Sequence, residues 1–243
     1  MTIGYDAKRF FNNFTGLGNY SRFIVDAVSR YYPDNHYYLY SPKAKSHPEI
    51  DQIVSRDHVH VVKPGVIGST SFLKSIWRSW GMSFHPTVST LDIYHGLSHE
   101  LPIGLPARIK KVVTVHDLIF MRYPQFYNPV DVRIYKAKVK SACNRADRIV
   151  AISQQTKDDL INFLNIDPLK IDVVYQGCHP IFKKSLSQTQ LENVRAKYNL
   201  PQEYILNVGT IESRKNAVLI VNALAQLPAE ERKTLVIVGR ETS

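Results

Sequence analysis

The chain has 243 residues, of which 44% are hydrophobic and 21% charged, a balance that supports an ordinary buried core and argues against wholesale disorder. Its formal net charge of +10 favours anionic partners, such as phosphorylated small molecules, acidic lipids or nucleic acid. No stretch approaches the ~18 apolar residues that a membrane span needs, and the charged N-terminus does not fit a signal peptide. We therefore expect a cytoplasmic protein.

Strand and helix patterns alternate along the chain, which is typical of an α/β protein with a mainly parallel sheet. Predicted strands cover Thr2–Asp6, Tyr37–Tyr40, Val59–Val62, Leu91–His95, Lys111–His116, Arg148–Ile152 and Ile171–Tyr175. Predicted helices cover Tyr20–Tyr31, the segment 132–146, and a segment that begins after Ser153 as its N-cap. Cys143 falls on the apolar face of the second of these helices, so we expect a buried thiol there.

Residues 71–84 form a basic amphipathic stretch that carries Trp77 and Trp80 on one helical face. Packing against the sheet is the simpler interpretation. Peripheral docking on the inner face of the plasma membrane is the alternative, because basic helices with tryptophans bind anionic lipid surfaces.

The composition becomes polar over residues 177–202, which resembles a connection between domains. Beyond it, a strand, a loop, an apolar helix and a second strand are predicted over Tyr204–Val208, Gly209–Lys215, Asn216–Leu227 and Thr234–Val238. One βαβ unit cannot bury both faces of its sheet, so we expect the beginning of a second Rossmann-like domain. The predicted division is a first domain at 1–176, a connection at 177–202 and a partial second domain at 203–243.

Three segments are candidates for chemistry. The first is the turn with Gly16, Gly18 and Asn19, whose backbone N–H groups can approach an anion at the start of a helix, although a tight turn that needs glycine is the alternative. The second lies at strand ends, where ligands of parallel sheets bind. There His116 can bond a sugar hydroxyl or help to move a proton, or it can be a satisfied loop histidine beside a turn-capping Asp117.

His95 ends a neighbouring strand, with His99 and Glu100 close behind. Together with His116 this gives three histidines near strand ends, but no pair of them has the helical spacing of a metalloprotease site and thiolate ligands are absent, so no metal is predicted.

The third candidate is the loop that follows Gly209. It places Arg214 and Lys215 near a helix N-terminus, where cations are unfavourable unless an anion such as a diphosphate binds between them and the helix. A solvated pair of cations is the alternative.

These segments together resemble the retaining GT-B glycosyltransferases of family 4, especially a bacterial group with many mannosyltransferases. The matching pieces are FTGLGNYSR, DIYHGLSHELP, VVTVHDLIFMRYPQFY, RADRIVAISQQTKDDL and VGTIESRKN. The resemblance implies two Rossmann-like domains, with the acceptor on the N-terminal domain and a nucleotide-sugar donor, GDP-mannose first, on the C-terminal one. It implies a hexosyltransferase that acts on a glycan or lipid-linked acceptor in cell-surface polysaccharide synthesis, without a metal or other cofactor.

By the same resemblance, Gly209, Arg214 and Lys215 contact the donor diphosphate, while His116 and Asp117 lie near the donor sugar. Gly16, Gly18, Asn19, His95, Glu100 and Ser153 line the acceptor side of the cleft. Thr210 stands where many relatives carry an arginine, and the family's paired glutamates would lie beyond Ser243. We therefore expect a chain truncated in the donor domain, with little transferase activity by itself. The alternatives are a non-catalytic partner subunit of the same fold and a basic protein that binds an anionic surface or nucleic acid, although no nucleic-acid module is present.

Overall fold

The computed structural model describes residues 1–64, 77 and 80–239. The chain falls into two compact units, Met1–Cys178 and His179–Ser243. The roles expected for the two domains, acceptor binding by the first and donor binding by the second, stay predictions.

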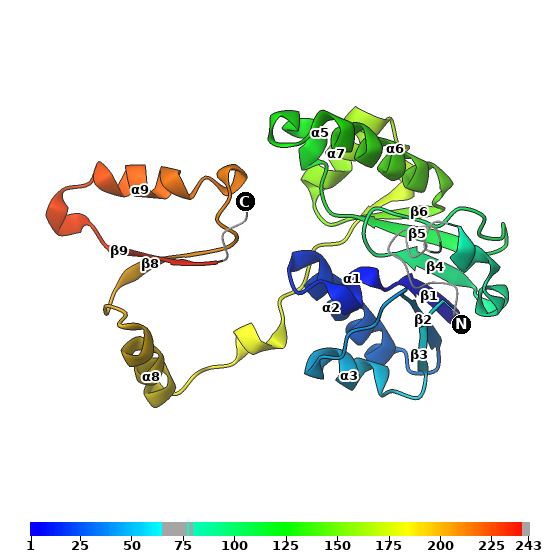
Figure 1. Cartoon of the computed structure of the whole chain (residues 1–243), viewed down its shortest axis with the longest axis horizontal. Coiled ribbons are helices and arrows are strands. Elements are labelled where there is room, and N and C mark those ends of the chain that lie inside the picture. Colours follow the sequence, from blue (N-terminus) through cyan, green and yellow to red (C-terminus); the bar gives the residue numbers. More distant parts are fainter. Residues whose placement is uncertain (65–76, 78–79, 240–243) are drawn as a thin grey trace. The chain divides into compact units, whose positions relative to one another are not determined.

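The first unit is built on a seven-stranded sheet in the order β3-β2-β1-β4-β5-β6-β7 (Figure 1). All of its neighbouring strands run parallel. The strands are β1 Thr2–Asp6, β2 His36–Tyr40, β3 Val59–Val62, β4 Ile93–Gly96, β5 Lys110–Val115, β6 Arg148–Ala151 and β7 Ile171–Val173. The strand order reverses at β1, whose neighbours β2 and β4 lead the chain away in opposite directions.

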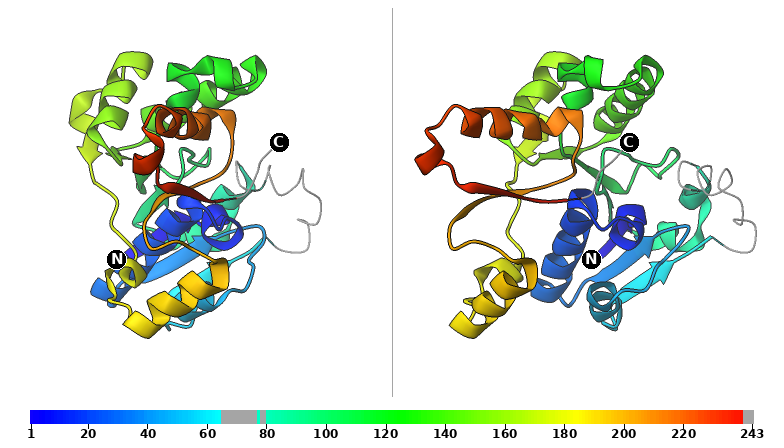
Figure 2. Two further views of the ribbon diagram at one scale, coloured as in Figure 1. Left: turned by 90° about the vertical axis from the view of Figure 1, so that its left-hand side faces the viewer. Right: turned by 60° about the vertical axis from the view of Figure 1, so that its left-hand side comes forward.

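Helices connect these strands and cover the sheet. Among the described residues, the α-helices of the first unit are α1 Lys8–Asn12, α2 Gly16–Tyr31, α3 Pro48–Val54, α5 Ile119–Arg122, α6 Pro129–Arg145 and α7 Gln154–Leu164. Short 3-10 helices lie at η1 Gly81–Phe84, η2 Pro86–Thr90, η3 Pro124–Phe126 and η4 Pro168–Lys170. Two views show α1, α2 and α3 gathered near β1–β3, and α5, α6 and α7 near β4–β6 (Figure 2). None of the described helices combines the length and the apolar character that crossing a bilayer requires.

Two clusters of buried apolar side chains form the core of the first unit. One packs around Tyr94, Val113 and Ile149 with the apolar sides of α6 and α7. The other packs around Tyr5 and Tyr37 with α1, α2 and α3. Side chains from the same strands enter different clusters because successive residues of a strand point to opposite faces.

The predicted strands of the first unit are confirmed, with end points that differ by at most two residues. The predicted loop at Gly16 and Gly18 is wrong, because α2 already begins at Gly16 and both glycines lie in its first turn. The Asn13 side chain produces this early start, since its Oδ1 accepts from the Thr15 and Gly18 N–H groups at 2.9 and 3.2 Å. The short α1 and α3 were not predicted.

The amphipathic stretch at 71–84 lies largely outside the described residues. Of its two tryptophans, Trp77 packs against the core, whereas Trp80 is 55% exposed. The described end of the stretch, Gly81–Phe84, is a 3-10 helix.

The second unit holds two parallel strands, β8 Tyr204–Val208 and β9 Thr234–Val238. Its helices are η5 Pro180–Lys183, α8 Gln188–Tyr198, η6 Ser213–Lys215, α9 Ala217–Ala225 and η7 Ala229–Glu231. The predicted strands of this unit are confirmed residue for residue, and its apolar helix is shorter than predicted.

Candidate functional site

The candidate site of the first unit lies at the carboxyl edge of the sheet, close to the point where the strand order reverses. His95 is the next-to-last residue of β4, and His116 follows β5 directly. β4 is paired with β1, at the reversal, and with β5. Crevices outside the carboxyl strand ends at such a reversal are where open α/β sheets bind ligands.

Thr114 of β5 connects two of the polar side chains at this edge. Its Oγ1 lies 2.9 Å from His95 Nε2 and 3.1 Å from the Tyr20 hydroxyl. Thr114 is fully buried, and its hydroxyl is a polar group in the otherwise apolar end of the strand, between Val113 and Val115. The hydrogen bonds therefore fix both side chains from inside the sheet, because a buried hydroxyl without a partner would be costly.

His116 and His99 form a second connected pair. The His116 N–H donates to His99 Nε2 at 2.9 Å, so this nitrogen of His99 carries no proton. His116 Nε2 lies 3.0 Å from the Leu97 carbonyl, which only accepts, so Nε2 donates and carries the proton. Neutral His116 then has its lone pair on Nδ1, for which no partner is recorded among the described residues. That nitrogen can accept a hydrogen bond from a ligand hydroxyl.

The rings around His116 hold it in place. Tyr20 meets its ring edge-on with centroids 4.6 Å apart, and His99 does so at 5.4 Å. The Thr156 hydroxyl of α7 donates to the His116 carbonyl at 2.9 Å. His99 itself has a φ of 62°, the left-handed region that costs a non-glycine residue energy and often occurs at functional sites.

Burial keeps these histidines neutral. It lowers the pKa of His95 to about 4. Burial, together with the neighbouring His116, lowers the pKa of His99 to about 4. The pKa of His116 is lowered by burial, against the raising effects of its bond to Leu97 and of Asp117. The site therefore presents hydrogen-bonding imidazoles at neutral pH rather than cations.

The glycine turn is held by a buried cation, Arg22 of α2, which is 5% exposed. Its Nη1 donates to the carbonyls of Phe10 and Asn13, both at 2.9 Å, and its Nη2 donates to Asn19 Oδ1 at 2.5 Å. Its guanidinium lies over the Phe14 ring, 5.1 Å from the centroid. Asn19 therefore contributes to the shape of the turn, and the Gly18 N–H is already bonded within the chain.

Three further predicted residues make structural contacts. Asp117 Oδ1 accepts from the Ile119 N–H at 3.2 Å and so caps the following turn. Ser153 Oγ accepts from the Thr156 N–H at 3.1 Å, which confirms Ser153 as the N-cap of α7. Glu100 pairs with Lys138 of α6 at 3.2 Å. His95, His116, Asp117 and Ser153 are thus brought to one edge of the sheet, whereas Glu100 is engaged with a helix.

Gly209, Arg214 and Lys215 belong to the second unit. Arg214 Nη2 pairs with Glu212 at 2.6 Å, while no partner of the Lys215 ammonium is recorded among the described residues. Both cations lie in the 3-10 turn η6, and Asn216 separates that turn from α9 with a φ of 50°. They therefore precede the helix instead of occupying its first turn, which removes part of the unfavourable dipole contact.

Tyr20, Thr114 and His99 were missed as site residues. Thr114 could have been found as a polar residue within an apolar strand. Tyr20 could have been found from its position in the glycine motif. A fourth, the exposed Arg9 of α1, acts at longer range, because its charge lowers the pKa of both His99 and His116. No pattern in the sequence indicated that α1 would bring this cation near the strand ends.

Within residues 1–64, 77 and 80–239, no group of three or more His, Cys, Asp or Glu side chains is arranged to hold a metal ion. That the protein works without a metal stays a prediction. Cys143 is buried as predicted, and burial raises the pKa of its thiol to about 12, whereas Cys178 is exposed.

The sequence of the chain is similar to a family of known proteins. Residues 25–180 match the model of Glycosyltransferase Family 4. The chain is 28% identical over 148 residues to the serotype-specific mannosyltransferase WbdA of Escherichia coli, which covers 59% of the chain and 18% of WbdA. It is also 28% identical over 141 residues to O-antigen chain mannosyltransferase B of Escherichia coli, covering 58% of the chain and 36% of that enzyme.

Solved structures share the fold. WaaG, a glycosyltransferase involved in lipopolysaccharide biosynthesis, has a TM-score of 0.65 at 16% identity, covering 100% of this chain and 64% of WaaG. Anabaena HepE, solved in complex with UDP and glucose, has a TM-score of 0.61 at 18% identity, covering 100% of this chain and 62% of HepE. The α/β fold of GT-B type predicted from the sequence is confirmed. The chain spans less than two thirds of the length of each of these relatives.

Proposed function

The chain belongs to Glycosyltransferase Family 4, and on this basis we propose that it acts in transfer of a hexose from a nucleotide sugar. Mannose from GDP-mannose is the first candidate, because curated relatives are named mannosyltransferases. The acceptor is a glycan or a lipid-linked glycan of cell-surface polysaccharide synthesis. Transfer proceeds with retention of the anomeric configuration.

The observation that carries the proposal is the uncharged polar cluster at the strand ends. A sugar presents hydroxyl groups that both donate and accept hydrogen bonds, and His116 Nδ1 offers an acceptor next to the reversal of strand order. Because burial lowers the pKa of His116, it stays a neutral acceptor at physiological pH. Its role is to hold a sugar hydroxyl in position, since a weakly basic imidazole is a poor proton acceptor.

The leaving group in such a transfer is a nucleoside diphosphate, which gains negative charge as the glycosidic bond to it breaks. Cations aimed at that charge stabilise the transition state, and such electrostatic stabilisation is usually the largest single contribution to catalysis. Lys215 fits this role best, because Arg214 already shares its charge with Glu212. In the proposed transfer these side chains take the place of a metal ion at the leaving group. The departing phosphate oxygen takes up the proton of the acceptor hydroxyl.

A calorimetric titration of nucleoside diphosphates tests the donor side. We expect GDP to bind more tightly than UDP, and Lys215→Gln to weaken GDP binding roughly 10- to 100-fold, the usual value of a hydrogen bond to a charged group. Lys184→Gln removes the same charge from an exposed lysine elsewhere in the second unit and serves as the matched control. Equal affinities of the two variants would mean that the diphosphate is not held by Lys215.

The alternative, that the chain is a non-catalytic partner subunit of the same fold, predicts a different result. In that case, His116→Gln would leave sugar transfer by any assembly that contains the chain unchanged. Under the proposed function the same variant lowers transfer, while GDP affinity stays within about twofold, because His116 contacts the sugar and not the diphosphate.

A further inference from the structure

The outer face of α6 carries an apolar ridge between two rows of cations. At 3.6 residues per turn, steps of four and three residues place the apolar Val130, Ile134 and Ala137 along one line of the helix, which ends at the polar Ser141. All four are exposed, with Val130 at 61% and Ile134 at 45%. The opposite side of the helix packs into the core through its three buried residues Val139, Ala142 and Cys143.

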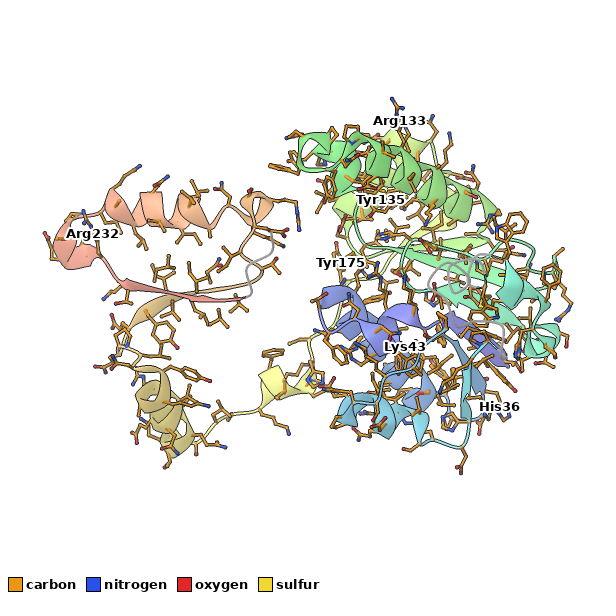
Figure 3. The ribbon with its side chains drawn as sticks, viewed as in Figure 1. His36, Lys43, Arg133, Tyr135, Tyr175 and Arg232 are labelled. Carbon is orange, nitrogen blue, oxygen red and sulfur yellow. The ribbon has the colours of Figure 1, made fainter. Side chains whose placement is uncertain are left out.

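The row of cations on one flank of this ridge is unpaired. Arg133, Lys136 and Lys140 are all exposed, and none has an ion-pair partner among the described residues. Figure 3 shows Arg133 at the outer edge of the first unit. On the other flank, Lys138 pairs with Glu100, and Arg145 donates to the Leu101 and Pro102 carbonyls. The first flank is therefore a charged row with no structural use within the described chain.

We propose that the outer face of α6 docks the protein on a membrane surface that contains anionic lipid. Apolar side chains flanked by Lys and Arg are the pattern of a helix that lies in the plane of the lipid headgroups. The ridge enters the headgroup boundary, and the cations meet the negative surface potential. The net charge of +10 supports the same orientation, since an anionic surface attracts the whole molecule.

Other occupants fit this face less well. A second copy of the chain would bring two rows of like charges together, and one helical ridge is far smaller than the ~800 Å² per partner of a stable interface. A nucleic acid would meet the cations but would leave the apolar ridge against its polar backbone, with no aromatic side chain on the ridge to stack a base. This docking surface does not depend on the proposed transfer reaction, and it differs from the stretch at 71–84.

Flotation with lipid vesicles tests the proposal on the whole chain. We expect binding to vesicles that contain phosphatidylglycerol and no binding to vesicles of phosphatidylcholine alone, with binding that weakens as the salt concentration rises. The triple variant Arg133→Gln, Lys136→Gln and Lys140→Gln should bind about 100-fold more weakly, at about fivefold per charge. Glutamine preserves helix propensity, so the far-ultraviolet circular dichroism and the Tm should not change.

A matched control separates this face from the overall charge. Lys43→Gln, Lys45→Gln and Lys63→Gln remove the same three charges from exposed positions outside α6, and this triple variant should keep most of the binding. Ile134→Gln, which leaves every charge in place, should also weaken binding. Equal losses in both triple variants, absence of binding by the unchanged chain at low salt, or binding of an oligonucleotide in place of vesicles would each overturn the proposal.

Discussion

Two glycines of one helical turn differ in the space around them. A Cβ on Gly18 would lie 1.7 Å from the Asn13 carbonyl oxygen, a backbone atom that cannot move aside cheaply, whereas a Cβ on Gly16 would meet nothing within 4 Å. We therefore expect Gly18→Ala to lower the free energy of unfolding by about 1–3 kcal/mol or more, because the turn must shift. Gly16→Ala should be neutral or stabilising by up to ~1 kcal/mol.

Denaturant unfolding of the two variants measures this difference, and each serves as the control for the other. If both variants lose the same free energy, the close approach of Asn13 to Gly18 is not what requires glycine there. The comparison also bears on the site, because the same turn carries Asn19, which Arg22 holds.

The neutral histidines at the strand ends make stability depend on pH. The pKa of His95 is about 4 in the folded protein against 6.5 when unperturbed, so the unfolded state binds more protons between these values. The stabilisation is therefore complete above about pH 6.5 and is lost as the pH falls towards 4. A shift of this size corresponds to roughly 3 kcal/mol as an upper limit, reduced by the partial exposure of the ring.

His95→Gln isolates this effect, since glutamine keeps a polar partner near Thr114 and does not titrate. We expect the free energy of unfolding of the variant to fall less steeply between pH 6.5 and 4 than that of the unchanged protein, by on the order of 1–3 kcal/mol. Lys43→Gln is the surface control. Parallel profiles would mean that His95 takes up its proton equally in the folded and unfolded states.

The sequence predicted which histidines lie at the strand ends, but it did not predict which residues they contact. His95 and His116 were predicted from their positions at strand ends, which depend only on local pattern and on the general rule for parallel sheets. Their partners Thr114, Tyr20 and His99 come from different elements, and only the pairing of β4 with β5 and the placement of α2 brings them together. Spacing along one sequence does not carry that information.

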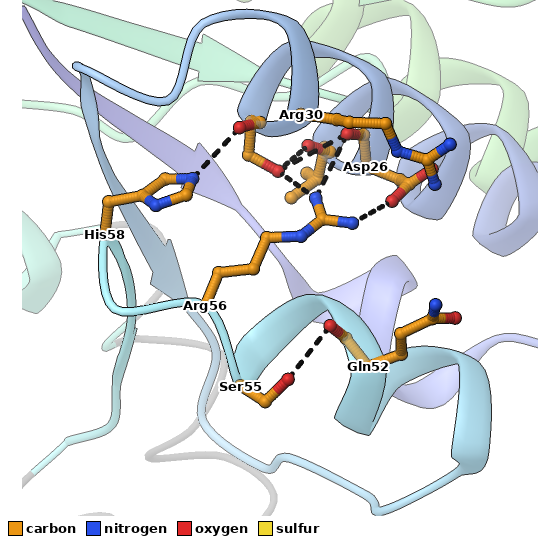
Figure 4. Close-up of polar contacts among 8 residues, drawn as sticks. Asp26, Arg30, Gln52, Ser55, Arg56 and His58 are labelled. Atoms are coloured by element: carbon orange, nitrogen blue, oxygen red, sulfur yellow. Dashed lines mark hydrogen bonds and ion pairs between the residues drawn. The ribbon is translucent and has the colours of Figure 1, made fainter.

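At the scale of secondary-structure elements, a half-buried network of ion pairs and hydrogen bonds joins α2 to the connection between α3 and β3 (Figure 4). Arg56 forms an ion pair with the Asp26 side chain, and its Nη1 donates to the Asp26 carbonyl at 3.1 Å and to Ser29 Oγ at 2.6 Å. His58 Nε2 donates to the Ser29 carbonyl at 2.9 Å. Arg30 pairs with the same Asp26 from its exposed side at 2.7 Å.

Removing the shared carboxylate should therefore cost more than removing one of its partners. We expect Asp26→Asn to lower the free energy of unfolding by about 1–3 kcal/mol, because the Arg56 side chain, only 19% exposed, loses its counter-charge. Arg30→Gln should cost no more than ~0.5 kcal/mol, since an exposed pair four residues apart on a helix is weak. Equal costs would show that the contact between α2 and the α3–β3 connection does not rest on Arg56.

Sequence patterns alone predicted some secondary-structure elements and missed others. Strands such as Val59–Val62 and Tyr204–Val208 were predicted residue for residue, because short apolar runs bounded by turn residues are distinctive. The five-residue α1 was missed because it is shorter than two helical turns and so has no periodicity to detect. Its stability comes from burying Phe10 and Phe11 in the core, which is a tertiary effect.

At the scale of the whole molecule, the two units differ in how much they bury. The first has a seven-stranded sheet with core clusters, whereas the second has a sheet of two described strands. In the second unit Leu206 is 53% exposed and Val208 70%, and α9 leaves Val218 and Leu219 more than 60% exposed. A two-stranded sheet with so much exposed apolar surface is marginally stable in water. The second unit should therefore open before the first does.

Limited trypsin digestion combined with thermal unfolding tests this order. We expect the first cuts after Lys183 and Lys184, which are exposed near the start of the second unit, followed by digestion of the rest of that unit. The remaining first unit should resist trypsin and unfold at the Tm of the main transition of the full chain, because its sheet and both of its clusters lie within Met1–Cys178. A single transition seen equally by all probes, or a lower Tm after cleavage, would mean that the second unit stabilises the first.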